Sequence, residues 1–209
     1  MRIPELRTRP VTLADTSILH RLYQQSERYF KIIAAPIPLE VDVRSELESA
    51  LSDPRRHLEF LLDSGFAGSG NAGSGNASSG NASSGQEQVV GYLDLKFNYP
   101  NHGDATINLL LIAQPFQSGG WGSRTVQDLE ARLNAGRIAH APTVHRLLAG
   151  IYAENPGAMR FWERHGYHFA IDARPVLAWY EKILGVPVAD SGAGPDSVSG
   201  SDKELHVSR

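Results

Sequence analysis

Six residues near the middle of the chain have the composition of an anion-binding turn. The segment Gln117-Ser118-Gly119-Gly120-Trp121-Gly122 follows an apolar run and precedes a helical pattern marked by Val126, Leu129 and Leu133. The first N–H groups of such a helix have no partner within it and carry the positive end of its dipole. A glycine turn suits a phosphate there, because it lets the anion approach those donors. Glycine pairs also form ordinary tight turns, so the choice between a phosphate site and a simple turn depends on the neighbouring segments.

A second polar position follows a later apolar strand pattern. Asn155 comes directly before Pro156, which favours the first turn of a helix. An asparagine at this point can cap that helix with its side chain. Ala158, Phe161 and Trp162 follow at i, i+3 and i+4, and such a stripe is more often core than cofactor site. We therefore expect Phe161 in the core.

The composition favours one globular domain. The chain has 209 residues, of which 41% are apolar and 21% charged, and this is enough for one well-packed core. A formal charge of −3 without Lys/Arg runs argues against a nucleic-acid partner, and without cysteine there is no disulfide or thiolate nucleophile. The N-terminus lacks the apolar core of a signal peptide, and no apolar run is long enough to cross a bilayer. We expect a cytoplasmic protein without membrane contact.

Periodicity predicts an alternation of strands and helices, which indicates an α/β (α+β) protein. One helix is expected to begin at Asp15 and to continue through Phe30, and a second to carry Val43, Leu47 and Leu51. Two more are expected after the glycine turn and from Pro156. The expected strands cover residues 6–11, 57–62, 89–97, 106–113, 144–153, 167–173 and 176–183.

Two segments lack an apolar pattern. Residues 64–86 repeat Gly, Ser, Asn and Ala, a composition typical of a flexible loop. Because strands are expected on both sides, this loop should be the tip of a long hairpin that interrupts the domain without ending it. Residues 189–209 are rich in Gly, Ser and Asp, which indicates a disordered tail. The predicted organisation is a single domain over 1–188 with an insertion at 64–86, followed by the tail.

The two motifs together resemble the GNAT superfamily of acyl-CoA-dependent N-acyltransferases. Gln117-x-x-Gly120-x-Gly122 after an apolar strand is similar to that family's pyrophosphate loop. The run from Asn155 to Tyr167 is similar to its later motif, an Asn and an Ala followed by an aromatic pair, a charged pair and Gly-aromatic. The resemblance implies a mixed, mostly antiparallel sheet of six to seven strands flanked by about four helices.

The resemblance also implies acetyl-CoA as the cofactor, CoA as the product and no metal. In the family, pantetheine lies in a gap where the strand ending near Ile112 splays from the strand ending near Ala153. We expect Pro115 to release that pairing, because proline has no N–H for the ladder. The residues expected at the cofactor are Leu111, Ile112, Gln117, Ser118, Gly119, Gly120, Trp121, Gly122, Ser123, Asn155 and Trp162.

The catalytic groups depart from the family pattern. Trp162 stands where many members carry a tyrosine that protonates the leaving CoA thiolate, and an indole has no proton to give near neutral pH. Where the strand leading to the cofactor often carries a carboxylate base, this chain has Asn108. The remaining candidates for acid or base are Glu154, Tyr152 and Asp94, although residues of these types are more often ordinary packed or solvated side chains than catalytic groups.

The expected acceptor is a primary amine of a small molecule or of a peptide, and the expected protein is a monomer or a homodimer. In the family the acceptor cleft is built from the first two helices and the late strands, here including Tyr29, Phe30 and Trp179. The alternative is a non-catalytic acyl-CoA-binding sensor or interaction module, motivated by Trp162 and the missing strand carboxylate.

Other classes of site fit the sequence less well. Gly122 is followed by Ser123-Arg124, not by the Lys-Ser/Thr of a P-loop NTPase. His165 and His168 flank a helix end, where a shared helical face for a metal is lost.

Overall fold

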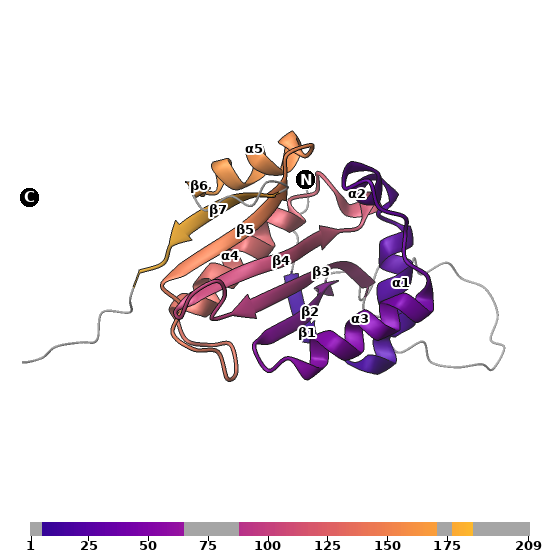
Figure 1. Cartoon of the computed structure of the whole chain (residues 1–209), viewed down its shortest axis with the longest axis horizontal. Coiled ribbons are helices and arrows are strands. Elements are labelled where there is room, and N and C mark those ends of the chain that lie inside the picture. The colour runs from indigo at the N-terminus through magenta and orange to yellow at the C-terminus, as the bar shows by residue number, and fades with distance from the viewer. Residues whose placement is uncertain (1–5, 65–87, 171–176, 186–209) are drawn as a thin grey trace, which may run out of the picture.

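The computed structural model describes residues 6–64, 88–170 and 177–185 of the chain. Within these ranges the chain forms one sheet and a set of helices (Figure 1). The strands are β1 (Leu6–Pro10), β2 (Arg56–Asp63), β3 (Gln88–Phe97), β4 (Asp104–Ile112), β5 (Arg146–Tyr152), β6 (His168–Ala170) and β7 (Leu177–Ile183). The α-helices are α1 (Thr16–Gln24), α2 (Glu27–Ile32), α3 (Glu40–Ser52), α4 (Trp121–Asn134) and α5 (Pro156–Arg164). Two short 3-10 turns, η1 (Leu13–Asp15) and η3 (Gln114–Phe116), precede α1 and α4.

The strands form a seven-stranded sheet in the order β1-β2-β3-β4-β5-β7-β6. Every neighbouring pair is antiparallel except β4 and β5, which run parallel. A parallel pair needs a crossover connection, and α4 supplies it. The mixed, mostly antiparallel sheet that the resemblance implied is confirmed.

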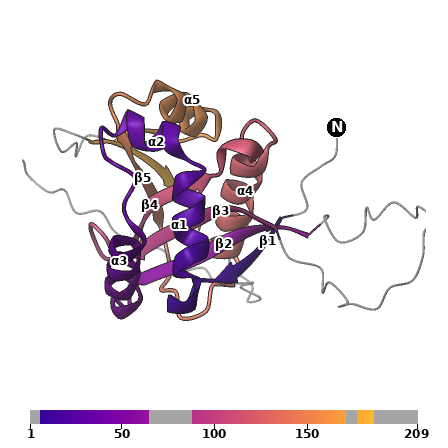
Figure 2. The same cartoon turned by 90° about the vertical axis from the view of Figure 1, so that its right-hand side faces the viewer.

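Helices cover both faces of the sheet, because the central strands are apolar on both sides. On β3, Leu93 and Leu95 are fully buried in the cluster that α4 and α5 join, while Tyr92 belongs to the cluster formed with α1, α2 and α3. Figure 2 shows α1 and α3 on one side of the strands and α4 on the other. The sheet is therefore the middle layer of three.

The first predicted helix is two helices. Asp15 precedes α1 as expected. Its carboxylate does not cap this helix and instead accepts hydrogen bonds from the Arg9 guanidinium and the Thr12 N–H. The chain then breaks before α2 at Ser26, which is buried and donates its hydroxyl to the Leu22 carbonyl at 2.8 Å. A serine hydroxyl that bonds back to the fourth preceding carbonyl competes with the helix ladder and bends the chain. Continuity through this point was a wrong prediction.

The second expected helix is α3, but not all of its apolar pattern lies in the core. Val43 and Leu47 are buried, whereas Leu51 is 43% exposed. Ala50 is buried in its place, so the buried stripe follows i, i+4 and i+7 from Val43.

The hairpin expected around the Gly/Ser-rich segment is confirmed in its strands. β2 pairs with β3 from Arg56↔Lys96 to Asp63↔Gln88. The segment between them falls almost entirely outside the described residues, as do residues 171–173 of the expected late strand and the tail at 189–209. The single-domain division over 1–188 thus stays a prediction.

Candidate functional site

The sheet opens between its two parallel strands. β4 and β5 pair only over four positions, from Asp104↔Arg146 to Ile107↔Ala149. β4 continues for five further residues to Ile112, and β5 for three to Tyr152, without pairing to each other. Among the described residues, the edge of β4 that faces β5 therefore has no strand partner beyond Ile107.

One arginine clamps the start of the paired segment, at the end away from the opening. The Arg146 guanidinium donates to both carboxylate oxygens of Asp104 on β4, at 2.9 and 2.6 Å, and to Glu181 on β7 at 2.9 Å. Such bidentate pairs fix geometry as well as adding energy. Three strands are therefore held in register three residues before β4 and β5 part at Ile107.

A β-bulge at Asn108 coincides with the opening. β3 pairs Asp94 with Leu109 and then Leu95 with Ile107, which leaves Asn108 as an extra residue in β4. A bulge of this kind bends its strand and increases the local twist. The expectation that Pro115 releases the pairing is therefore wrong: pairing to β5 has already ended at Ile107, and Pro115 lies beyond the end of β4, in η3.

The glycine-rich turn leaves the start of α4 open to an anion. Ser118 and Gly120 have positive φ angles of 62° and 84°, and Gly120 is the N-cap of α4 in the left-handed conformation. No side chain caps this helix, and its first turn holds no acidic residue. The first N–H groups of α4 are thus free of a capping side chain, as an anion site requires.

Packing explains other glycines of this turn. A Cβ at Gly122 would lie 3.2 Å from Cε2 of Phe161 on α5, and one at Gly119 would lie 3.2 Å from the Phe116 carbonyl oxygen. Gln117, expected at the pyrophosphate, donates its side-chain amide to the Ile112 carbonyl at 2.9 Å. That bond ties the turn to the end of β4, so the loop and the free strand edge are one unit.

The later motif has a clear structural role. Asn155 caps α5, its Oδ1 accepting from the Ala158 N–H at 3.1 Å, which confirms the capping interpretation. Trp162 is 6% exposed and packs on Tyr167, with ring centroids 4.7 Å apart. Phe161, expected in the core, is only partly buried and packs against its edge. Trp162 is therefore the more deeply buried of the two aromatic residues.

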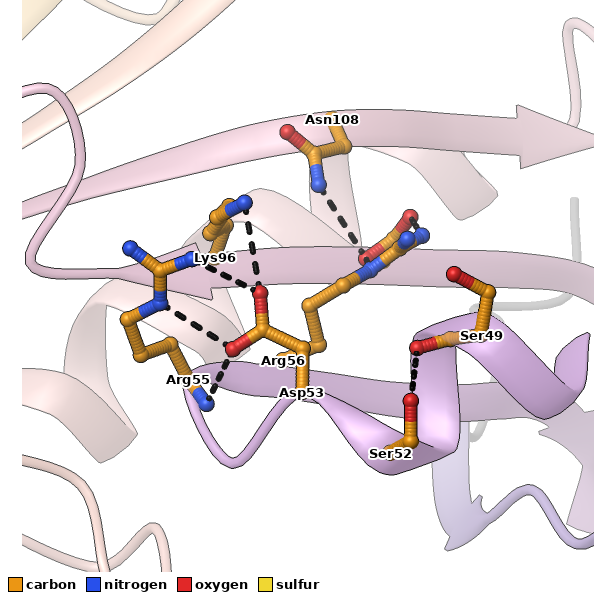
Figure 3. A network of polar contacts seen from close by, with 8 residues as sticks. Ser49, Ser52, Asp53, Arg55, Arg56, Lys96 and Asn108 are labelled. Atoms are coloured by element: carbon orange, nitrogen blue, oxygen red, sulfur yellow. Dashed lines mark hydrogen bonds and ion pairs between the residues drawn. The ribbon is translucent and has the colours of Figure 1, made fainter. Parts of the chain in front are cut away.

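The three candidate acids or bases occupy different surroundings. Asp94 is buried on β3; the Arg56 guanidinium binds both of its oxygens, and Asn108 donates to it at 3.4 Å. Burial raises the pKa of Asp94, against the opposing effect of Arg56. Glu154 is exposed in the turn after β5. Figure 3 shows Arg56 and Asn108, which both donate to Asp94, beside a second group in which Asp53 binds Arg55 and Lys96.

Tyr152, the third candidate, has an aromatic neighbour from the helical layer. It is the last residue of β5 and is partly buried. Burial, and then the nearby Tyr152, raise the pKa of Tyr29 on α2 to about 12. Tyr29, expected in the acceptor cleft, is therefore within electrostatic range of Tyr152, whereas the side chain of Trp179 is outside the described part of the structure.

Sequence reasoning missed the polar partners of these candidates. Nothing in the sequence marked Arg56 as the partner of Asp94, because the two are joined across β2 and β3. Asn108 was noted as the residue in place of a base, but not as a bulge. Within the described residues, no three acidic or histidine side chains are grouped to hold a metal ion.

A cavity of about 730 Å³ lies beside α1 and borders the start of the turn. Its lining residues include Arg9, Arg21 and Gln25, together with Pro115 and Phe116, which directly precede the turn. It includes neither the glycines of the turn nor any residue of β5. We therefore assign the candidate site to the gap and the turn rather than to this cavity.

Comparison with known proteins identifies the class. Residues 42–167 match the model of the acetyltransferase (GNAT) family. An acetyltransferase from Thermus thermophilus has 33% identity, a TM-score of 0.70 and coverage of 88% of this chain and 100% of its own. The chain belongs to the GNAT acetyltransferase family.

Two more distant structures share the fold. Spermidine N-acetyltransferase from Vibrio cholerae, in complex with CoA and spermine, has 14% identity over 86% of this chain and 96% of its own, with a TM-score of 0.61. PaiA N-acetyltransferase from Thermoplasma acidophilum, in complex with coenzyme A, has 12% identity over 86% and 99%, with a TM-score of 0.58. A search of curated proteins gave no match. In the described residues, no helix has the length and apolar character that a membrane span needs.

Proposed function

We propose that this protein transfers an acetyl group from acetyl-CoA to a primary amine of a small molecule or peptide, by direct attack while both are bound. The observation that carries the proposal is the unpaired edge of β4 beyond Ile107, which leads to an α4 N-terminus with no capping side chain. The β4 edge is a row of backbone groups without a strand partner, and the α4 N-terminus is a set of N–H donors suited to phosphate.

The residues present fit such a cofactor. Ile112 would offer its backbone N–H to the pantetheine arm along the free edge. The N–H of Ala113 bonds Val90 of β3, so the alternation of the strand turns the backbone groups of Leu111 toward β3 as well, and Leu111 would border the arm without bonding it. Residues 117–123 would surround the pyrophosphate, with Asn155 and Trp162 on the opposite wall. When bound, acetyl-CoA supplies an activated acyl group as a thioester. Gly120 permits the left-handed turn that points the α4 N–H groups outward.

The chain's own residues must orient the amine and handle its proton. Among the three candidates, we favour Tyr152, because it ends β5 at the gap and lies within electrostatic range of Tyr29, which is expected in the acceptor cleft. A tyrosine hydroxyl can both donate and accept a hydrogen bond. Asp94 is less suited as a base, since Arg56 binds both of its oxygens. Glu154 is exposed and can exchange protons with solvent.

Acetyl transfer is tested by measuring CoA release from acetyl-CoA with a panel of amines that includes polyamines, amino acids and peptide N-termini. Turnover with any amine supports the proposal. Binding of acetyl-CoA without turnover on the whole panel would favour the alternative, a non-catalytic acyl-CoA sensor. A Tyr152→Phe variant should keep cofactor affinity and lose at least about a hundredfold in kcat, the low end of the effect of a proton-transfer group.

We also propose a cytoplasmic location, because acyl-CoA is an intracellular substrate. The proposed state is a monomer or homodimer that binds neither nucleic acid nor membranes, consistent with the formal charge of −3.

A further inference from the structure

A hydrogen bond joins the two halves of the candidate site. His165 Nε2 lies 3.0 Å from Ser123 Oγ. Ser123 is the third residue of α4, in the turn proposed to hold the pyrophosphate, and His165 directly follows α5. The bond therefore connects the anion-binding turn to a titratable ring at the end of α5.

The imidazole is held in place by its neighbours. Its ring stands edge-on to Phe161, at 4.6 Å between centroids and 90° between planes. Its backbone N–H donates to the Trp162 carbonyl at 2.9 Å, and its own carbonyl accepts from Lys182 Nζ at 3.1 Å. These contacts leave the ring little freedom to move away from Ser123.

The protonation state of the ring controls what the serine can donate. A hydroxyl has one proton, and a neutral imidazole has one nitrogen that donates and one that accepts. When His165 is neutral and its Nε2 carries no proton, Nε2 accepts a hydrogen bond from the Ser123 hydroxyl, which then has no proton left to donate elsewhere. With protonated His165, Nε2–H must donate to Ser123 Oγ, so the hydroxyl proton is free for another acceptor. Protonation also brings a positive charge to the turn.

We propose that His165 is a positioning residue for Ser123, and that its protonation tightens binding of the CoA diphosphate. This inference rests on the proposed function. The charged groups that act on the ring are Glu130 of α4, Lys182 of β7 and Arg164 of α5. Glu130 and Lys182 form an ion pair at 2.7 Å, so their effects on the ring largely cancel. Burial lowers the pKa of His165, so the change in affinity should fall on the acid side of the usual histidine range.

The test is calorimetric titration of the full chain with 3′-dephospho-CoA between about pH 5 and about pH 8. This probe keeps the diphosphate but lacks the phosphate monoester of CoA, whose own titration near pH 6 would mask the effect. We expect affinity to rise about three- to tenfold toward low pH, the effect of one added hydrogen bond or nearby charge. The midpoint should match the pKa of His165 measured by NMR.

Three variants make the test specific. His165→Gln keeps a polar partner for Ser123 but cannot titrate, so its affinity should be independent of pH. Ser123→Ala should lose most of the pH dependence. His168→Gln, an exposed histidine close by in the sequence, should keep it. If His165→Gln does not fold by circular dichroism, His165→Asn takes its place.

The outcomes separate the two proposals. Binding that varies equally with pH in wild type and His165→Gln, or that is flat in wild type, overturns this inference and leaves the proposed function intact. Absence of binding at every pH overturns the proposed function and the inference with it.

Discussion

Ile107 of β4 pairs with Ala149 of β5, and no later residue of either strand pairs with the other. The next residue, Asn108, is the extra residue of a bulge against β3. The bulge against β3 and the opening toward β5 thus begin at the same point of β4. The free strand edge that carries the proposed function follows from this single insertion in the ladder.

Deleting Asn108 should close the gap. Ile107 packs on the α4 side of the sheet and Leu109 on the α1/α3 side, so joining them directly restores normal alternation without moving either side chain to the wrong face. We expect a folded protein by circular dichroism whose affinity for CoA is reduced at least about tenfold, a loss of about 1.4 kcal/mol.

The matched control for that deletion is Asn108→Ala, which keeps the extra residue and removes only the amide that donates to Asp94. Its CoA affinity should stay close to that of the wild type. Unchanged affinity in the deletion variant would mean that the bulge does not produce the opening.

Gly122 should tolerate alanine less well than Gly157. A Cβ at Gly122 would meet Phe161 at 3.2 Å, whereas one at Gly157 would have only an ordinary contact of 3.6 Å with Asn155 Oδ1. Both glycines are helical, so both gain the same helix propensity. We expect the free energy of unfolding of Gly122→Ala to be about 1 kcal/mol below that of Gly157→Ala, the low end of the overpacking effect. Equal values from urea denaturation would contradict the packing role.

Asn155 should contribute as a helix cap. Asn155→Ala removes the acceptor of the Ala158 N–H and should lower the free energy of unfolding by about 1 kcal/mol. Asn155→Asp keeps an oxygen at that position and should retain most of the stability. Thermal or urea unfolding of the two variants compares them directly. A stability loss as large in Asn155→Asp would rule out capping as the cause.

Glu59 should stabilise the contact between α4 and the sheet. It is 4% exposed on β2 and accepts two hydrogen bonds from Arg132 of α4, each 2.8 Å long, and one from His57. Glu59→Gln removes the buried one of the two carboxylates that bind the Arg132 guanidinium and leaves it only Asp128, so it should lower the free energy of unfolding by about 2 kcal/mol. Glu48→Gln, at an exposed pair with Arg44, should change it by less than about 0.5 kcal/mol.

The contribution of Glu59 should depend on pH. Burial alone would raise its pKa, but the bonds from His57 and Arg132 outweigh burial and lower it from 4.5 to about 2. A carboxylate whose pKa is lower in the folded state stabilises above its ordinary value and loses that effect as pH falls. The stability difference between wild type and Glu59→Gln should therefore be constant above about pH 5 and shrink between about pH 4.5 and about pH 2. A difference that grew toward acid would contradict this sign.

Sequence patterns predicted most strands and the order of the helices, because those depend on local periodicity. The glycine turn and the Asn155 cap were also predictable, since each is a local signal at a helix start. The split between α1 and α2 was missed because the hydroxyl of Ser26 takes a carbonyl that periodicity assigns to the ladder.

The position of the opening could not be predicted in the same way. A bulge is defined by the register between two strands, and the register of β3 against β4 is not visible in either segment alone. The pairing of Asp94 with Arg56 and the approach of Tyr29 to Tyr152 likewise join residues far apart in the sequence. The sequence indicated Pro115 as a local strand breaker, whereas the bulge next to which β4 and β5 part lies seven residues earlier, at Asn108.

Isothermal titration of the full chain with acetyl-CoA, with CoA and ATP as controls, tests the central claim most directly. Binding of acetyl-CoA and CoA, with no binding of ATP, is the predicted result, because the free edge of β4 should recognise pantetheine in addition to the phosphates at α4. If neither acetyl-CoA nor CoA binds, the glycine-rich turn and the gap between β4 and β5 do not form a cofactor site, and the proposed function is contradicted.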